Sequence, residues 1–427
     1  MKIALVNPAW RFDGSTYFGC TSPHLPLELG YCKQLLEGAG HQAEIVDANL
    51  QTLTNTEAAD RVAAFRPDIT VITTAPSYLF WRCTQPELTV PREFLDCLAK
   101  RGGTTVAVGP HGSVTPRTTI QKLDTDIVVR GECEEAVQSL AQEAPEDVSG
   151  IAFRKNGEIV INGSPRSARF TDAPPLRWHD EFIGRHSHHH HRFDREATGY
   201  GAEVEASRGC PYACTFCAKI DFRDRYRRRA LEPLLSEIDG LMLQGVTYLY
   251  FIDEIFLPNR ALLEALVERN VTFGIQTRID LWKPEMLALL GRAGCVSVEA
   301  GVESLTEHGR DALAKKCRLT TEELTDLLIA ARQNIPFVQA NLIGMEGDDP
   351  NVVAAWRERL RRASVWANDP VPLYPYPSSP DYRRLFGEPD DHAWERSHAY
   401  YLKQFARFSD LQNEHPLPLG ELEATCR

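Results

Sequence analysis

Three cysteines lie close together near the middle of the chain, at Cys210, Cys214 and Cys217, with the spacing CxxxCxxC. Three thiolates can hold three corners of a cubane iron–sulfur cluster and leave the fourth iron open for a small molecule. A structural zinc site would normally be closed by four ligands. The spacing therefore favours a catalytic cluster. The alternative is a zinc knuckle completed by a remote Cys or His, such as His186 or a histidine within 188–191.

Composition sets broad limits on the class of protein. The chain has 427 residues, which suggests two or three domains, and 43% of them are hydrophobic, enough to build real cores. The net charge of −12 argues against a nucleic-acid partner. No apolar run approaches the length of a bilayer span, and the N-terminal run meets Pro8 too soon for a signal peptide. The 11 cysteines, scattered except for the triplet, favour a reducing compartment, so we expect a cytoplasmic protein without a membrane partner.

The first 148 residues alternate short apolar runs with amphipathic stretches. The runs lie at 3–6, 43–46, 69–72, 105–108 and 127–129. Buried strands separated by helices predict an α/β domain with a doubly wound, Rossmann-like sheet of five parallel strands. Such a sheet binds ligands at the carboxyl ends of its strands. The segments at those ends are 7–10, 73–78, 109–112 and 131–132.

A second series of βα units follows a hairpin and interdomain linker, which we place at 149–200 with Asn156-Gly157 as the hairpin turn. The second domain spans 201–378. Its strands are expected at 203–206, 248–252, 273–277, 296–300, 337–343 and 371–374. Six units are too few for a closed eight-fold barrel, so we predict a partial (βα)6, TIM-like barrel whose site lies at the carboxyl ends of the strands. Residues 379–427 form a small C-terminal extension, with a helix expected at 398–408 and no assigned role.

The triplet and the residues at the later strand ends resemble the signature of the radical S-adenosylmethionine superfamily. An aromatic residue precedes the last cysteine, and two acids end the second strand of this domain. Glu299 begins a run similar to the superfamily's Gly-x-Glu-Ser element, and residues 344–347 resemble the glycine-rich turn that lies near the adenine of S-adenosylmethionine. The resemblance implies that the three cysteines hold a 4Fe–4S cluster. It implies contacts to S-adenosylmethionine from Phe216, Asp253, Glu254, Gln276, Arg278, Glu299, Glu303 and Met345.

The same resemblance implies radical chemistry. The open iron chelates the amino and carboxylate groups of S-adenosylmethionine, and an electron from the reduced cluster yields a 5′-deoxyadenosyl radical. The protein orients the cofactors and excludes water and oxygen, while the cofactors break the bond. An external electron donor such as flavodoxin or ferredoxin is then needed. No catalytic side chain is assigned.

The first domain resembles the cobalamin-binding module that often precedes a radical S-adenosylmethionine barrel. The matching patterns lie at 26–31, 38–47, 108–116 and 126–132. The resemblance implies cobalamin contacts from Trp10, Ser77, Tyr78, Leu79, Gly109, His111, Gly112 and Glu132. The stretch after the first strand lacks the cobalt-ligating histidine of the wider fold, which implies base-off cobalamin with a weak or missing lower ligand. The alternative is a Rossmann-like fold that has lost its ligand or binds a nucleotide, although no GxGxxG follows the first strand.

Together these resemblances predict a cobalamin-dependent radical enzyme that methylates an unactivated carbon of a small molecule. In that scheme one S-adenosylmethionine methylates cob(I)alamin and a second supplies the radical that abstracts hydrogen from the substrate. One alternative is a radical rearrangement, ring contraction or redox reaction with cobalamin as electron mediator. Another is a non-catalytic sensor of cobalamin or redox state.

Two further runs have alternative interpretations. The histidine-rich run 186–191 is either a solvated linker or a metal-binding tract. The arginines within 223–229 either clamp the cysteine loop or contact a phosphate, since the guanidinium fork suits phosphate oxygens.

Overall fold

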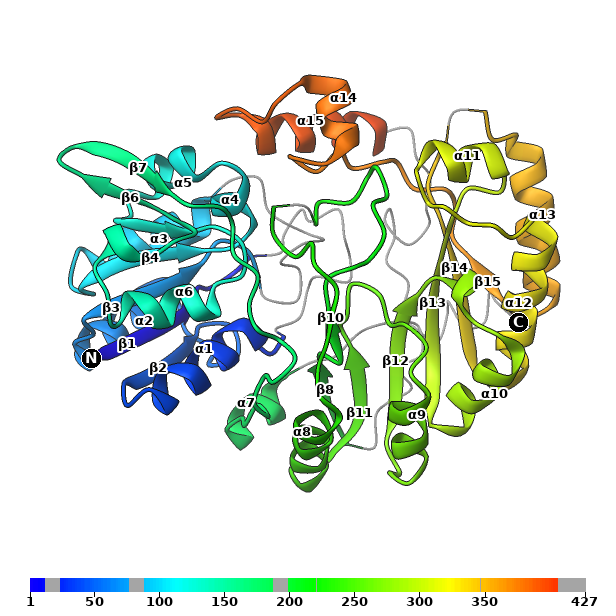
Figure 1. Cartoon of the computed structure of the whole chain (residues 1–427), viewed down its shortest axis with the longest axis horizontal. Coiled ribbons are helices and arrows are strands. Elements are labelled where there is room, and N and C mark those ends of the chain that lie inside the picture. Colours follow the sequence, from blue (N-terminus) through cyan, green and yellow to red (C-terminus); the bar gives the residue numbers. More distant parts are fainter. Residues whose placement is uncertain (12–23, 77–87, 187–198, 220, 346, 406–427) are drawn as a thin grey trace.

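The computed structural model describes residues 1–11, 24–76, 88–186, 199–219, 221–345 and 347–405. Within these residues the chain folds into two α/β bodies, with the first sheet on one side and an open, barrel-like sheet on the other (Figure 1). Helices α14 (Pro380–Phe386) and α15 (Ala393–Phe405) lie across one end of both bodies. None of the described helices is both long enough and apolar enough to span a membrane.

The first sheet confirms the predicted doubly wound arrangement. Its strand order is β2-β1-β3-β4-β5-β6-β7, and the first five of these pair in parallel. The parallel strands are β1 (Lys2–Asn7), β2 (Gln42–Asp47), β3 (Ile69–Thr73), β4 (Thr104–Val108) and β5 (Ile127–Val129). Most of their buried side chains are apolar on both faces because helices cover both faces.

Each face of this sheet has its own core. Helices α1 (Leu27–Gly38) and α6 (Glu134–Leu140) bury Leu29, Leu36 and Val137 on one face. The other face is covered by α2 (Asn55–Phe65), α3 (Thr89–Leu98) and α5 (Pro116–Leu123). The short helix α4 (Pro110–Val114) follows β4 at the carboxyl edge.

The predicted hairpin extends the first sheet and is not part of a separate linker. Strands β6 (Ile151–Lys155) and β7 (Glu158–Asn162) are antiparallel, and Ile127 of β5 pairs with Phe153. Positive φ angles at Asn156 and Gly157 confirm the turn. The described sheet therefore has seven strands where the sequence predicted five. Alternation in the sequence indicates a hairpin, but it does not indicate which sheet edge the hairpin joins.

The segment after the hairpin is packed between the two bodies. Phe170, Trp178 and Phe182 are buried in the same core as the barrel strands, as the aromatic content of this segment predicts, while Phe193 lies outside the described residues. Helix α7 (Asp180–Arg185) ends this packed stretch. A Cβ atom at Gly30 of α1 would lie 2.7 Å from the Trp178 ring, so this close approach requires glycine.

The second sheet is an open parallel sheet, as predicted for a partial barrel. Its order is β15-β14-β13-β12-β11-β8. The strands are β8 (Tyr200–Val204), β11 (Val246–Phe251), β12 (Thr272–Thr277), β13 (Cys295–Glu303), β14 (Phe337–Leu342) and β15 (Trp366–Ala367). The covering helices are α8 (Leu231–Leu243), α9 (Arg260–Val267), α10 (Pro284–Arg292), α12 (Thr321–Asn334) and α13 (Pro350–Arg362). The short helix α11 (Glu307–Ala312) follows β13.

The sixth strand lies earlier than predicted. Strand β15 pairs with β14 at residues 366–367, and in the predicted range only Val371 makes an isolated bridge, to Ile343. Pro370 and Pro372 flank Val371 and have no N–H to donate, so a continuous ladder cannot form there.

Candidate active site

The cysteine triplet lies on a loop that begins and ends in a small antiparallel ribbon. This ribbon pairs β9 (Ser207–Arg208) with β10 (Arg227–Arg228), directly after β8. Within the loop, Lys219 Nζ donates to the Cys210 carbonyl over 2.6 Å. Gly209 has φ of +79°, and a Cβ atom there would lie 2.3 Å from the Arg225 carbonyl oxygen, so the entry to the loop requires glycine.

The three thiols are buried enough that three thiolates need a positively charged partner. Burial raises the pKa of Cys210 and Cys214, and it raises the pKa of Cys217 to about 12. Neighbouring thiols add to the rise in the pKa of Cys210 and Cys217, whereas Lys219 lowers the pKa of Cys210 and Lys315 lowers that of Cys214. A bound metal cluster supplies the positive charge that stabilises three thiolates together.

The spacing of the thiols does not suit a single zinc ion. Among the described residues, one group of three potential ligands brings its atoms within 4.8 Å of one another, and the triplet is not that group. Sulfur ligands about 2.3 Å from one tetrahedral zinc lie about 3.8 Å apart. His186, the candidate fourth ligand of a zinc knuckle, pairs instead with Glu203. The geometry therefore favours the wider cubane.

The acids at the end of β11 hold the entry to the cysteine loop. Asp253 accepts hydrogen bonds from the Ala206 amide over 2.9 Å and from Ser207 Oγ over 2.5 Å. Burial nevertheless raises the pKa of Asp253 well above its usual range. Glu254 accepts from the Gly209 amide over 2.7 Å and pairs with Arg223. Both carboxylates therefore position the loop, and their contact with S-adenosylmethionine stays a prediction.

The next strand ends surround the same loop. Gln276 donates from Nε2 to the Asp253 carbonyl over 3.0 Å. Arg278 pairs with Asp280, and its guanidinium lies 4.1 Å from the ring centre of Tyr212, inside the CxxxCxxC run. Two predicted residues, Phe216 and Met345, are half-buried.

The fourth strand end contributes two of the predicted acids and one basic residue whose role the sequence leaves open. Asn341 Nδ2 lies 3.5 Å from Glu299 Oε2. Glu303 has a φ of +70° and accepts from Lys315 Nζ over 3.2 Å. Lys315 is buried and lowers the pKa of Cys214, which places its charge beside the triplet. Its position after the Gly-x-Glu-Ser element is the signal that identifies it.

A buried ion-pair network joins the cysteine loop to the first domain. The loop arginines Arg208 and Arg227 pair with Glu134 and Glu132 of the first domain, in both cases over 2.5 Å. Arg208 and Arg223 both pair with Glu205, and their charges lower the pKa of this carboxyl to about 2 although burial alone would raise it. Sequence reasoning predicts the clamp by the arginines within 223–229, but not its acidic partners.

Four of the predicted cobalamin residues, Trp10, Gly109, His111 and Gly112, follow strands of the first sheet at its carboxyl edge. Trp10 is buried and donates from Nε1 to Asn7 Oδ1 over 2.6 Å, and Gly109 has a φ of +135° at the start of α4. His111 is buried with its ring centre 4.5 Å from that of Trp394 in α15. A Cβ at Gly112 would lie 2.3 Å from Val128 Cγ1, so packing within the domain already requires this glycine.

Other predicted cobalamin contacts have different surroundings. Glu132 is occupied by Arg227 and by the Ala168 amide, which donates over 2.5 Å. Ser77, Tyr78 and Leu79 lie outside the described residues. One polar atom at this edge that sequence reasoning did not single out is Thr74 Oγ1, which is buried without a hydrogen-bond partner among the residues that the structure describes.

Comparison with known proteins identifies the barrel as a domain of a known superfamily. Residues 204–359 match the family model of the Radical SAM superfamily, and this stretch runs from the end of β8 into α13. It therefore contains the cysteine triplet and the strand ends described above. Residues 204–359 therefore form a Radical SAM domain, and such a domain implies a 4Fe–4S cluster and S-adenosylmethionine as cofactors.

Individual relatives resemble most of the chain. An uncharacterized methyltransferase of Pyrococcus horikoshii is 26% identical over 351 residues, 78% of this chain and 72% of that protein. The anaerobic magnesium-protoporphyrin IX monomethyl ester cyclase of Cereibacter sphaeroides is 25% identical over 413 residues, 90% of this chain and 64% of the cyclase. One similar solved structure is that of the radical S-adenosylmethionine methyltransferase TsrM from Kitasatospora setae, with cobalamin and a 4Fe–4S cluster bound. Its TM-score is 0.71 at 18% identity, and the match covers 89% of this chain and 76% of TsrM. The structural likeness shows a shared fold.

Proposed function

We propose that the chain is a cobalamin-dependent radical S-adenosylmethionine enzyme that methylates a carbon atom of a small molecule. The observation that carries the proposal is the link between Arg208, two residues before the first cluster cysteine, and Glu134, which follows β5 of the first sheet. Parallel sheets of this type bind ligands at the carboxyl ends of their strands. A ligand held by the first sheet would therefore face the cysteine loop.

Features of the first sheet fit cobalamin. A tetrapyrrole with a long nucleotide tail needs close backbone approach and buried hydrogen-bonding groups at the edge of the sheet. Gly109 with its positive φ meets the first need, and the buried Thr74 hydroxyl meets the second. The TsrM structure contains bound cobalamin, which supports the same assignment here. Trp10, Gly109 and Thr74 are the described residues that we expect to contact it.

The barrel residues have positioning roles in this proposal. When bound, the cluster and S-adenosylmethionine supply the radical, and cobalamin supplies a carrier for the methyl group. Asp253 and Glu254 hold the loop that presents the cysteines, and the buried pair of Lys315 and Glu303 lies beside Cys214. The network around Arg208 keeps this loop against the first sheet.

The C-terminal extension contacts both the cysteine loop and the first domain. The amide of Asp381, in α14, donates to the carbonyl of Thr215 over 3.0 Å, between two of the cluster cysteines. Trp394 of α15 donates from Nε1 to Thr115 Oγ1 of the first domain over 3.2 Å. The extension thus contacts both bodies, and we propose that it shapes the space for a small-molecule substrate. A one-electron donor such as flavodoxin or ferredoxin would reduce the cluster.

A second candidate function is supported by the cyclase relative. In that reaction class the radical leads to ring formation or rearrangement and no methyl group is transferred. Products distinguish the two functions, because methyl transfer yields S-adenosylhomocysteine together with 5′-deoxyadenosine, whereas rearrangement yields 5′-deoxyadenosine alone. A sensor would form no 5′-deoxyadenosine under reducing conditions with any substrate.

Removing the cluster ligands tests whether the cluster and cobalamin bind at two independent sites. The triple variant Cys210→Ala/Cys214→Ala/Cys217→Ala should lose cluster iron and 5′-deoxyadenosine formation while it retains one equivalent of cobalamin through gel filtration. Cys97→Ala is the matched control, because Cys97 lies on α3 away from the loop, and it should retain both cofactors. Loss of cobalamin in the triple variant would contradict two independent sites.

A further inference from the structure

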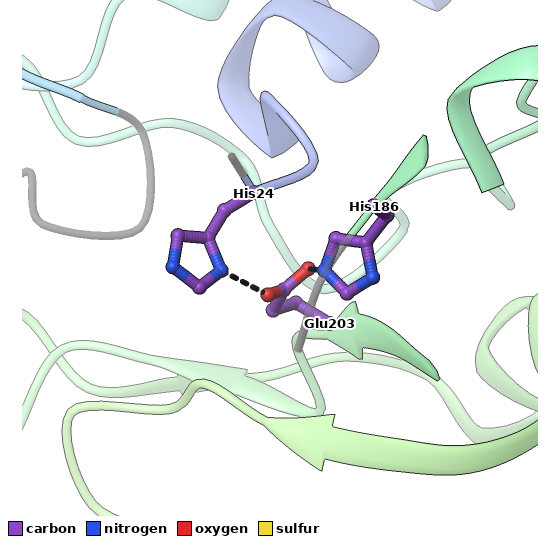
Figure 2. A group of neighbouring side chains, drawn as sticks. All are labelled: His24, His186 and Glu203. Atoms are coloured by element: carbon purple, nitrogen blue, oxygen red, sulfur yellow. Dashed lines mark hydrogen bonds and ion pairs between the residues drawn. The ribbon is translucent and has the colours of Figure 1, made fainter. Parts of the chain in front are cut away.

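Three buried side chains from separate parts of the chain meet beside the first barrel strand (Figure 2). His24 precedes α1, His186 follows α7 and Glu203 lies on β8. His24 Nδ1 lies 2.6 Å from Glu203 Oε1, and His186 Nε2 lies 2.6 Å from Glu203 Oε2. The exposed fractions of the three residues are 6%, 7% and 1%.

These side chains form a set of potential metal ligands. Their ligand atoms all lie within 4.8 Å of one another, and this is the one such group among the described residues. Two imidazoles and one carboxylate are the ligands of catalytic His₂Glu zinc sites and of facial-triad iron sites. Nitrogen ligands favour these ions over calcium and magnesium, which prefer oxygen.

The present distances are compatible with an ion after a small adjustment. Ligand atoms about 2.0–2.2 Å from a common tetrahedral ion lie about 3.3–3.6 Å apart. Each imidazole would therefore move away from the carboxylate by less than about 1 Å. The same imidazoles can instead act as hydrogen-bond donors to the two carboxylate oxygens, and this purely structural arrangement is the outcome that the experiment must exclude.

We propose that His24, His186 and Glu203 bind one divalent transition-metal ion, with Zn²⁺ as the ion best matched to the ligands. The site is separate from the cysteine triplet and does not depend on the function proposed above. Because the ligands come from the segment before α1, the segment after α7 and strand β8, the ion would tie the first domain and the packed linker to the barrel.

Zinc binding to the full chain tests the proposal. The background for all variants replaces the three cluster cysteines with Ala and His188, His189, His190 and His191 with Ser, so that neither thiols nor the histidine tract take up zinc. After removal of metal with a chelator, Zn²⁺ is titrated against a chromophoric competitor. We expect one equivalent to bind. Glu203→Gln and His24→Ala should weaken binding by about 100-fold or more, because losing a ligand costs more than the roughly 10–100-fold loss caused by altered second-shell partners.

Controls separate a lost ligand from a damaged fold. His41→Ala changes a histidine of the first domain outside the group and should leave zinc affinity unchanged. X-ray absorption at the zinc edge of the iron-loaded enzyme that carries only the His188–His191 substitutions provides a second measurement with the cluster cysteines intact. It should show two imidazole ligands and no sulfur. Absence of a stoichiometric site, unchanged affinity in both ligand variants, or sulfur ligation would each overturn the proposal.

Discussion

Arg208 donates a hydrogen bond from Nη1 to Glu134 Oε1 over 2.5 Å, and both side chains are buried. Arg208 enters the cysteine loop, whereas Glu134 begins α6 after the last parallel strand of the first sheet. Phe170 of the packed linker stacks on the same guanidinium, 4.4 Å from ring centre to Cζ. One arginine therefore connects the loop, the first sheet and the linker.

Replacing Arg208 should destabilise the whole assembly. Arg208→Ala leaves Glu134 and Glu205 buried without their shared cation, and breaking a buried pair in this way costs about 3–5 kcal/mol. The free energy of unfolding from urea titration measures the loss. Arg260→Ala removes an exposed pair with Glu264 and should change stability by less than about 1 kcal/mol. Equal effects of the two substitutions would argue against a structural role for the buried network.

Replacing Asp253 should loosen the cysteine loop. Asp253→Ala removes the side chain that accepts from two donors, the Ala206 amide and the Ser207 hydroxyl. An unmet buried hydrogen bond costs about 1–3 kcal/mol. We expect the variant to lose cluster iron to a chelator several-fold faster than the parent chain. Asp239→Ala, which removes an exposed partner of Arg269, serves as control, and identical iron loss in both variants would refute the positioning role.

Stability should decrease between pH 5 and pH 7 because of Asp47. Burial raises the pKa of Asp47 to about 6, above the 3.8 of an unperturbed carboxyl, although hydrogen bonds from the Leu50 amide and Asn7 oppose the shift. The folded chain therefore binds more protons than the unfolded chain between these values. This stability is complete below pH 3.8 and is lost as the pH rises through 6.

The expected loss from Asp47 between pH 5 and pH 7 is about 1 kcal/mol. It is obtained from the free energies of unfolding of the parent chain and of Asp47→Asn at both pH values. The substitution should make the parent's decrease smaller by that amount. If the two chains show the same pH dependence, Asp47 does not titrate in this range.

Trp394 should anchor the extension to the first domain. Its buried indole contacts His111 and donates to Thr115, so Trp394→Ala removes both interactions and about 3–5 kcal/mol of packing. We expect limited proteolysis to cleave the exposed stretch 387–392 faster in this variant. Trp394→Phe keeps an aromatic ring and should lie between the variant and the parent chain. Unchanged cleavage of Trp394→Ala would show that α15 is held by other contacts.

Much of the fold and of the candidate site follows from local sequence. Buried apolar runs separated by helices predict both parallel sheets, because strands covered on both faces must be apolar throughout. Residues at the ends of β11, β12 and β13 gather around the triplet because parallel strands share one carboxyl edge. Asp253, Gln276 and Glu303 are examples of such residues that local spacing identifies.

Long-range partners could not be predicted in the same way. In the sequence, Glu134 has the pattern of an ordinary acid in the first turn of a helix. Only the folded chain brings it into contact with Arg208, which lies 74 residues later in the sequence. Likewise, nothing in the local sequence relates His24 to Glu203, which are 179 residues apart. The Trp394 contact with Thr115 spans 279 residues and gives the extension a role that composition does not indicate.

We propose that S-adenosylmethionine and cobalamin face each other, between the cysteine loop and the carboxyl edge of the first sheet, for methyl transfer. The most direct test uses reduced enzyme loaded with cobalamin, mixed with methyl-deuterated S-adenosylmethionine in the absence of substrate. We expect S-adenosylhomocysteine in an amount equal to the bound cobalamin, and none when cobalamin is omitted. Formation of 5′-deoxyadenosine without any cobalamin-dependent S-adenosylhomocysteine would contradict methyl transfer and favour the rearrangement alternative.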